Sequence, residues 1–462
     1  MDNIIYSSAK SLAHAIHTGE INSQEVIEAY LQRIEEVNPQ LNAIVQLQAE
    51  EARVQARKAD ESLARGEIKG PLHGVPFTVK DNAEVKGIIC TSGTKGRSSF
   101  VPGQDATIVA RMKDAGAILL GTTNLPELAL TFESDNLVYG CTLNPYDFSR
   151  TPGGSSGGEA AIIAAGGSPL GLGNDAGGSI RLPSHFCGIA GIKPTAGRVP
   201  LTGHFPPAFG HITKIWQAGP MARYVEDLIL TLPIIAGVDW QDPAIVPMPL
   251  GDPAAVEIGK LRAAVYTDNG IFPPTPETIK VVEEAAKVLS DAGMDVTEAL
   301  PPGIEKSFWF ENAIFEADAG YWIEKSLEFA GTTETHPFTQ GILEECHSAA
   351  MSTADFSELL IKLDMFRSEI LSFMKKYDVI ICPVCACPAI EHGTSFDVFP
   401  AFSYTMTYNL TGWPAAVVRA GTSPDGLPIG VQVVARPWRE DVALAVVQHI
   451  EKFLGGWKPP QL

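Results

Sequence analysis

Short apolar runs separated by glycine and proline constrain the fold of this chain more than any other feature. Helical stretches lie between these runs, at about 105–115, 158–166 and 224–235. Strands that alternate with helices predict an α/β fold, in which helices cover both faces of a parallel or mixed sheet. The runs that predict buried strands are Val75–Lys80, Ala117–Leu120, Pro169–Leu172, Val379–Cys382, Ala415–Ala420 and Ile429–Val434.

We expect residues 1–462 to form a single domain made of four consecutive segments. Residues 6–68 are expected to be helical, and residues 69–235 carry the glycine-rich loops described below. Residues 236–376 open with a region rich in Pro, Asp and Gly and then become mostly helical, which predicts a variable excursion on one side of the sheet. Residues 377–462 return to strands and complete the core. The helices expected outside the core lie at 7–18, 23–37, 45–66 and 440–454.

The charge and cysteine content exclude several classes of protein. A formal net charge of −20 argues against nucleic acid and anionic membranes as partners, because both require clustered Lys and Arg. The 7 cysteines are odd in number and scattered, which indicates reduced thiols and a cytoplasmic protein. The stretch Met1–Tyr6 does not resemble a signal peptide, and no apolar run is long enough to span a membrane.

Two glycine-rich loops carry serines in unusual settings. In Thr151–Glu159, four glycines surround Ser155 and Ser156 directly before a helical run. In the second loop, Gly177 and Gly178 precede Ser179, so the successive N–H groups from Ala176 onward can point into one concavity. Such an arrangement is suited to stabilising an oxyanion, although either loop by itself would more often be an ordinary turn.

Lys80 ends an apolar strand pattern, a position where lysine is seldom found without a partner. A lysine that extends to water from a strand end would explain the residue if it stood alone. Combined with the two serine loops, it indicates a nucleophile, a proton relay and a base. A lysine base must be neutral at working pH, which requires a pKa far below about 10.4, and burial can supply such a shift.

These loops resemble the amidase signature family. The motifs are Gly-Gly-Ser-Ser-Gly-Gly at 153–158, Asp-x-Gly-Gly-Ser-Ile-Arg-x-Pro at 175–183 and Val-Lys-Asp-Asn at 79–82, followed by family-like segments at 187–195, 219–222 and 409–414. The resemblance extends from about residue 6 to the end. It implies the family's fold, with a large twisted mixed sheet, and no cofactor or metal. A homodimer is left open.

The resemblance also implies a role for each site residue. Ser179 would be the nucleophile, Ser155 the relay and Lys80 the base, with a cis peptide bond between Gly154 and Ser155. The substrate would be a small acyl or aryl amide, and esters and carbamates (urethanes) are left open because they present the same carbonyl. The N–H groups of Ala176, Gly177 and Gly178 would form the oxyanion hole, and Ser156, Asp175 and Arg181 would support the loops.

Apolar and aromatic residues in loops near these motifs are expected to form the substrate pocket. A mostly apolar pocket favours aryl or acyl amides. Further pocket loops are expected at His204–Phe209 and Phe402–Trp413. The expected pocket residues are Ala129, Leu130, Phe132, Tyr139, Gly154 and Phe402.

Three other interpretations compete with this one. The first is the glutamine-hydrolysing A subunit of a tRNA-dependent amidotransferase. Relatives of that type carry an Asp just before the Asn-Leu-x-Gly segment, where this chain has Ala401–Thr405 without an acid. The second is a non-catalytic binding protein, which would normally have lost one of the three key residues. The third is a zinc site at Cys382, Cys385 and Cys387 with His392, which lacks a second cysteine pair.

Overall fold

A single sheet of 11 strands organises the computed structural model, which describes residues 4–207 and 210–462. β2 is parallel to β3 and β4, and β7 is parallel to β8 and β9, whereas all other neighbouring pairs are antiparallel. The predicted mixed α/β sheet is therefore confirmed. In sheet order the strands are β1 (Ile44–Leu47), β3 (Ile118–Thr123), β2 (Pro76–Lys80), β4 (Leu170–Asp175), β6 (Gln217–Ala222), β5 (Ala190–Lys193), β10 (Ala415–Thr422), β11 (Pro428–Ala435), β9 (Val379–Pro383), β7 (Arg262–Val265) and β8 (Asp295–Glu298).

Both faces of the sheet are buried, which is why its strands carry apolar residues on both faces. In β10, Ala416 and Val418 belong to one hydrophobic core, whereas Val417 between them belongs to a second core on the opposite face. Successive side chains of a strand point to opposite faces, so this alternation places one core on each side. The first core includes α7 (Val225–Ile235) and α14 (Glu440–Leu454), and the second includes α6 (Arg181–Phe186) and α13 (Ser403–Leu410).

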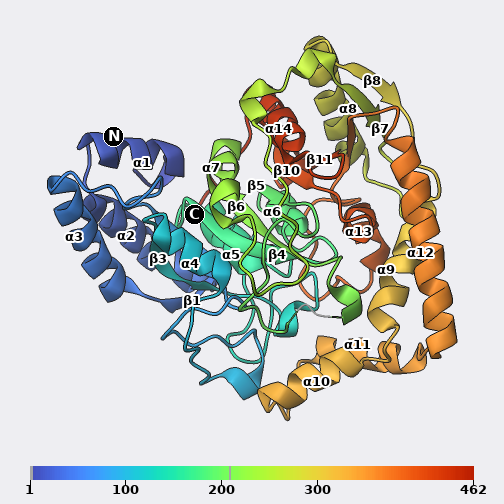
Figure 1. Cartoon of the computed structure of the whole chain (residues 1–462), viewed down its shortest axis with the longest axis horizontal. Coiled ribbons are helices and arrows are strands. Elements are labelled where there is room, and N and C mark those ends of the chain that lie inside the picture. The colour runs from blue at the N-terminus through green and yellow to red at the C-terminus, as the bar shows by residue number, and fades with distance from the viewer. Residues whose placement is uncertain (1–3, 208–209) are drawn as a thin grey trace.

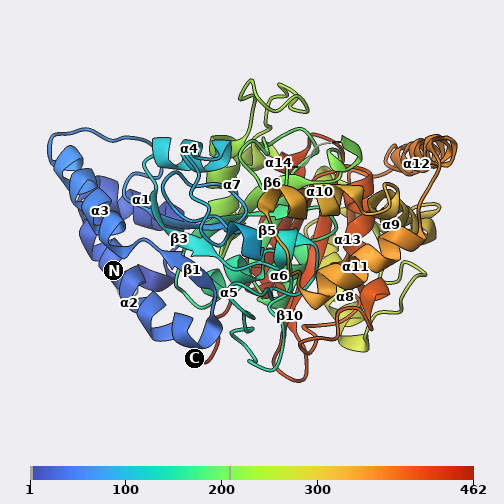
Figure 2. The ribbon, with the colours of Figure 1, turned by 90° about the horizontal axis from the view of Figure 1, so that it is seen from below.

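Two groups of the remaining helices lie toward the two ends of the sheet (Figures 1 and 2). α1 to α3 lie at the end near β1, and α9 to α12 lie at the other end, near α13. Among the described residues, no helix has the length and apolarity to cross a membrane. The helices other than α6, α7, α13 and α14 are α1 (Ala9–Thr18), α2 (Ser23–Leu41), α3 (Ala49–Ala64), α4 (Thr107–Asp114), α5 (Gly157–Ala164), α8 (Pro276–Asp291), α9 (Ser307–Glu316), α10 (Tyr321–Ala330), α11 (Pro337–Ser348) and α12 (Thr353–Phe373).

The helix expected at 45–66 begins later than predicted, because its first residues form β1. The Asn38 side chain accepts the N–H groups of Ala43 and Ile44 at 2.9 and 2.8 Å and donates to the Ile44 carbonyl at 2.9 Å. These bonds direct the chain from α2 into an antiparallel pairing with β3. The helix predicted for 45–66 was therefore wrong at its first residues, where pairing with the sheet overrides the local helical preference.

β5 and β6 have no counterpart among the predicted strands. They contain Gly191, Gly219 and Pro220, which are poor strand formers. The structure shows why glycine is needed, since a Cβ on Gly219 would collide with the Ile192 carbonyl oxygen of β5. Close approach of neighbouring backbones, rather than side-chain propensity, determines these strands.

Candidate active site

Lys80 is the last residue of β2 and is completely buried within the sheet. Its Nζ donates to Ser155 Oγ at 2.7 Å and to Asn174 Oδ1 at 2.9 Å. Burial lowers the pKa of this amine well below its ordinary value, and the nearby Asp175 and Glu159 offset only part of that effect. The arrangement therefore favours a neutral amine that can accept a proton from Ser155.

The first glycine–serine loop leads directly into α5. The Gly154–Ser155 peptide bond is cis, as the family resemblance implies. The Ser156 N–H donates to the Ser179 carbonyl at 3.2 Å, and the Ser156 hydroxyl donates to the Asn174 carbonyl at 3.2 Å. Ser156 thus connects the loop that carries Ser155 to the loop that carries Ser179.

The second loop, 176–179, joins the end of β4 to α6. Ser179 is 6% exposed and lines a cavity together with Ala176 and Gly177. The Gly178 N–H donates to Asp175 Oδ1 at 2.9 Å and so already has an acceptor. Within the part of the chain that the structure describes, the N–H groups of Ala176, Gly177 and Ser179 have no protein acceptor. These three donors, rather than Gly178, are available for an oxyanion.

Backbone geometry at Gly178 requires glycine. Its φ is +137°, and a Cβ there would collide with Thr405 Oγ1 and Leu182. Thr405 in turn donates its hydroxyl to the Gly177 carbonyl at 2.6 Å. The turn before Ser179 is therefore held by a residue of α13, more than 200 positions away along the chain.

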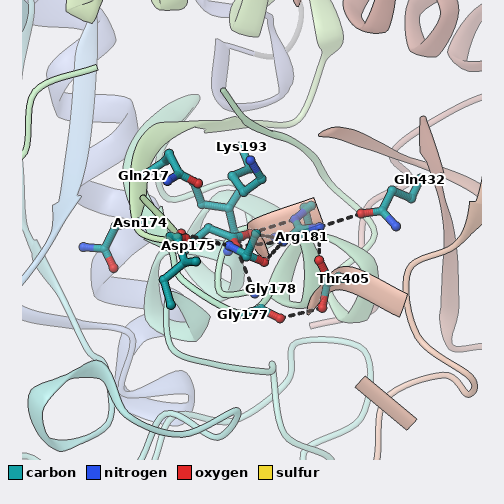
Figure 3. A network of polar contacts seen from close by, with 12 residues as sticks. Asn174, Asp175, Gly177, Gly178, Arg181, Lys193, Gln217, Thr405 and Gln432 are labelled. Atoms are coloured by element: carbon teal, nitrogen blue, oxygen red, sulfur yellow. Dashed lines mark hydrogen bonds and ion pairs between the residues drawn. The ribbon is translucent and has the colours of Figure 1, made fainter. Parts of the chain in front are cut away.

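A buried ion pair anchors this loop (Figure 3). Arg181 Nε and Nη2 each donate to Asp175 at 2.9 Å, and neither side chain is exposed. Burial raises the pKa of Asp175, but the Arg181 guanidinium outweighs that effect and lowers the pKa to about 2. Arg181 Nη1 also donates to the Thr405 carbonyl at 2.8 Å and to Gln432 Oε1 at 2.7 Å. The pair joins the loop to α13 and β11.

Removing one partner of this pair is expected to destabilise the protein strongly. Arg181→Met would leave the Asp175 carboxylate buried without its counter-ion, which typically costs about 3–5 kcal/mol. The free energy of unfolding in urea would measure this loss. Arg65→Met is the matched control, because the Arg65–Glu67 pair is exposed and contributes little. Similar unfolding midpoints for the two variants would contradict this prediction.

Two groups next to Lys80 had not been assigned a role from the sequence. Asn174 accepts from Lys80 and donates to Asn82 Oδ1 at 2.8 Å. Because β2 and β4 are parallel neighbours, the carboxyl ends of both strands meet at one edge, a signal that could have indicated Asn174. Glu159 accepts from Thr123 Oγ1 at 2.8 Å and from Thr78, and burial raises its pKa to about 8. Its buried carboxyl group ties α5 to β2 and β3.

Three of the six expected pocket residues line the cavity beside Ser179: Ala129, Leu130 and Phe132. His211, Trp216 and Met406 also line it, and Met406 lies on α13, the helix that occupies most of the loop expected at Phe402–Trp413. Positions 208 and 209 of the expected loop His204–Phe209 lie outside the described residues. Much of the remaining wall comes from α9 to α11, in the segment 236–376, where a variable excursion was expected and no single pocket residue was named.

The other three expected pocket residues do not line this cavity. Phe402 is fully buried behind it and packs its ring 4.7 Å from that of Phe132. The Tyr139 hydroxyl accepts from Gln46 on β1 at 3.1 Å, which turns it toward the sheet edge. Gly154 lies against the backbone of 131–133, where a Cβ would have no room. Their assignment to the pocket wall is therefore corrected.

The cysteines considered as a zinc site do not converge. Cys385 and Cys387 lie 3.9 Å apart, but Cys382 contacts Gln432 Nε2 at 3.3 Å, and His392 contacts Cys141 at 3.3 Å. Across residues 4–207 and 210–462, no group of three or more His, Cys, Asp and Glu side chains is placed to hold a metal ion.

Comparisons with known proteins agree with this geometry. The family model described as Amidase matches residues 25–444. Fatty-acid amide hydrolase 2-A of Danio rerio is 34% identical over 488 residues, which cover 99% of this chain and 90% of that protein. The A subunit of glutamyl-tRNA(Gln) amidotransferase from Prochlorococcus marinus (strain MIT 9303) is 34% identical over 468 residues, 94% of each chain. The solved structure of 6-aminohexanoate cyclic dimer hydrolase superposes with a TM-score of 0.89 at 29% identity, covering 99% of both chains.

The family model covers most of the chain, and the relatives align with nearly all of it. The motifs around Lys80, Ser155 and Ser179 also lie together in three dimensions, on adjoining strands and loops of one sheet. The chain therefore belongs to the amidase signature family.

Proposed function

We propose that this chain is a free-standing serine amidase with Ser179 as nucleophile, Ser155 as proton relay and Lys80 as base. The observation that carries this proposal is the buried Lys80 amine, 2.7 Å from Ser155 Oγ, beside a loop tied to Ser179 through Ser156. Members of the family are serine hydrolases that act on amides, so cleavage of an amide C–N bond is the reaction class.

The reaction would proceed through an acyl-enzyme. Ser179 Oγ attacks the amide carbonyl carbon while its proton passes by way of Ser155 to Lys80. The N–H groups of Ala176, Gly177 and Ser179 hold the negatively charged oxygen. The C–N bond then breaks, and the amine leaves with the proton returned from Lys80 through Ser155. Water attacks the acyl-enzyme by the same route and releases the acid and free Ser179.

The cavity supports small acyl or aryl amides as substrates. Phe132, Trp216, Phe315 and Phe399 supply much of its wall, and such a surface favours substrates with apolar parts. Esters and carbamates present a carbonyl to the same N–H donors, so we extend the proposal to them as slower or alternative substrates.

An alternative is hydrolysis of glutamine as part of a tRNA-dependent amidotransferase. The 34% identity to the glutamyl-tRNA(Gln) amidotransferase chain over 94% of both proteins favours it. The absence of an acid in Ala401–Thr405 counts against it, because relatives of that type use an Asp there to bind the glutamine amine.

A substrate panel separates these two functions. The purified chain alone would be given 4-nitroanilides, 4-nitrophenyl esters, aryl carbamates and free glutamine, and the released amine, phenol or ammonia would be measured. We expect turnover of the anilides without any partner protein and no release of ammonia from glutamine. Turnover of glutamine alone would replace the proposal by the alternative.

A further inference from the structure

Glu311 of α9 is a buried acid that faces the site without a protein partner. It is 2% exposed and lines the same cavity as Gly177 and Ser179. Neither of its carboxyl oxygens has a hydrogen-bond partner among the described residues. Its Oε1 lies 3.4 Å from the position that a Cβ on Gly177 would occupy, so the carboxyl group faces the loop of oxyanion donors.

The cations around Glu311 are engaged elsewhere. Burial raises the pKa of Glu311 well above its ordinary value, and Arg181, Arg367 and Lys193 lower it only in part, because none of them donates to it. Arg181 binds Asp175 and Gln432, Lys193 donates to the Pro194 and Trp413 carbonyls, and Arg367 donates to Asp364 and the Leu410 carbonyl.

The rest of the cavity is also suited to a positive charge. Glu316, Asp318 and Glu345 line it as well, whereas no lysine or arginine does among the lining residues that the structure describes. Aromatic rings such as those of Phe132 and Trp322 make up other parts of the wall and attract cations through their faces. An anionic substrate group would be repelled here.

A cationic group would resolve two physical problems at Glu311. A buried acid without a partner is costly, and an ammonium supplies both the hydrogen-bond donor and the opposite charge. A negatively charged carboxylate beside Gly177 would also oppose the oxyanion that forms there during catalysis. An ammonium group on the substrate would neutralise the charge of this carboxylate.

We propose that Glu311 binds a protonated amine of the substrate, so that the preferred substrates are amides with an ammonium group only a few bonds from the scissile carbonyl. The short separation between Glu311 and the Gly177 backbone sets this spacing. The ammonium belongs either to the acyl part, as in an aminoacyl amide, or to the leaving amine. The inference rests on the proposed function and names its substrate class.

The test compares substrates that differ only in charge. β-Alanyl 4-nitroanilide and butanoyl 4-nitroanilide place an ammonium or a methyl group at the same position of the acyl chain. Mono-acetylated ethylenediamine and N-propylacetamide make the same comparison on the amine side. The ratio of kcat/KM within each pair would be measured at pH 7 for the native chain, Glu311→Gln and Glu305→Gln. Glu305 is an exposed acid near the start of α9 and provides the matched loss of charge.

We expect the native chain to prefer the cationic member of one pair, and that pair identifies which part of the substrate carries the ammonium. The preference should fall by about 10- to 100-fold in Glu311→Gln, the loss of one hydrogen bond between charged groups, and persist in Glu305→Gln. Equal ratios in all three proteins would overturn the inference.

Two further outcomes have defined meanings. If Glu311→Gln does not fold, the kcat/KM ratios of the native chain test the inference alone. Faster turnover of the neutral member in both pairs would overturn it. Failure of the proposed function has a different signature: turnover of all four amides would persist in Ser179→Ala whatever the ratios, and both proposals would then fall.

Discussion

Replacing Ser179 with alanine is expected to lower kcat/KM for a 4-nitroanilide by about 10⁴- to 10⁶-fold. The hydroxyl is the group that we propose forms the acyl-enzyme, and its loss leaves only the oxyanion donors and substrate binding. The residual rate would be measured by release of 4-nitroaniline at high enzyme concentration. A burst of product in the native chain that is absent from the variant would report the acyl-enzyme directly.

Ser149→Ala serves as the control for this experiment. Ser149 is exposed, its hydroxyl donates to Asp147 at 2.7 Å, and it belongs to neither of the two glycine–serine loops. The activity of the Ser149→Ala variant should match that of the native chain. If Ser179→Ala retained more than about one hundredth of the native rate, another residue would have to be the nucleophile.

Replacing Lys80 with methionine is expected to reduce kcat/KM by about 10²- to 10⁴-fold at neutral pH, the usual contribution of a general base. Methionine keeps the length and apolar stem of lysine but cannot accept the proton from Ser155. In the native chain kcat/KM should rise with pH through the lowered pKa of Lys80, because only the neutral amine acts as the base. The variant should lose this rise.

The pH dependence of stability tests the lowered pKa of Lys80 independently of the reaction rate. The folded state binds the Lys80 proton less readily than the unfolded chain, whose lysine pKa is about 10.4. The unfolded state therefore holds more protons at any pH between the lowered pKa and about 10.4, and this amine makes stability rise with pH across that window. The free energy of unfolding in urea, measured at two pH values inside this window, should therefore rise less with pH in Lys80→Met than in the native chain.

Lys193→Met is the matched control for Lys80. Lys193 is also buried, and burial lowers its pKa to about 7, but its Nζ donates to the Pro194 and Trp413 carbonyls at 3.0 and 2.6 Å. Its replacement should affect stability more than the rate. A larger loss of activity in Lys193→Met than in Lys80→Met would contradict the assignment of the base.

The parts of the fold that follow from local pattern were predictable. β2, β9 and β11 are fully buried and mostly apolar, and the sequence predicted each within about a residue of its observed bounds. β5 and β6 were missed because backbone proximity, as at Gly219, determines them rather than propensity. The first residues of the helix expected at 45–66 were wrong because pairing with β3 outweighs the local pattern.

The residues of the candidate site also fall into two groups, those that sequence motifs predict and those that only long-range packing brings to the site. Lys80, Ser155 and Ser179 lie in motifs that can be recognised along the chain, and the structure brings their loops together. Thr405, Gln432 and Glu311 have no distinctive local sequence, since their contacts with 175–181 are made only when distant elements pack. Half of the expected pocket residues were misplaced for the same reason, because packing with distant segments places Phe402 behind the cavity and directs Tyr139 toward β1.

The buried Arg181 network spans the chain from Asp175 to Gln432, and this spacing has a consequence for synthesis. A polypeptide emerging from the ribosome presents the nucleophile loop long before α13 and β11 exist to hold it. Until then the guanidinium lacks its acceptors on Thr405, Asn409 and Gln432, and the glycine turn lacks the Thr405 hydroxyl. Hydrolytic competence is therefore expected only after α13 and β11 have formed and packed against the nucleophile loop.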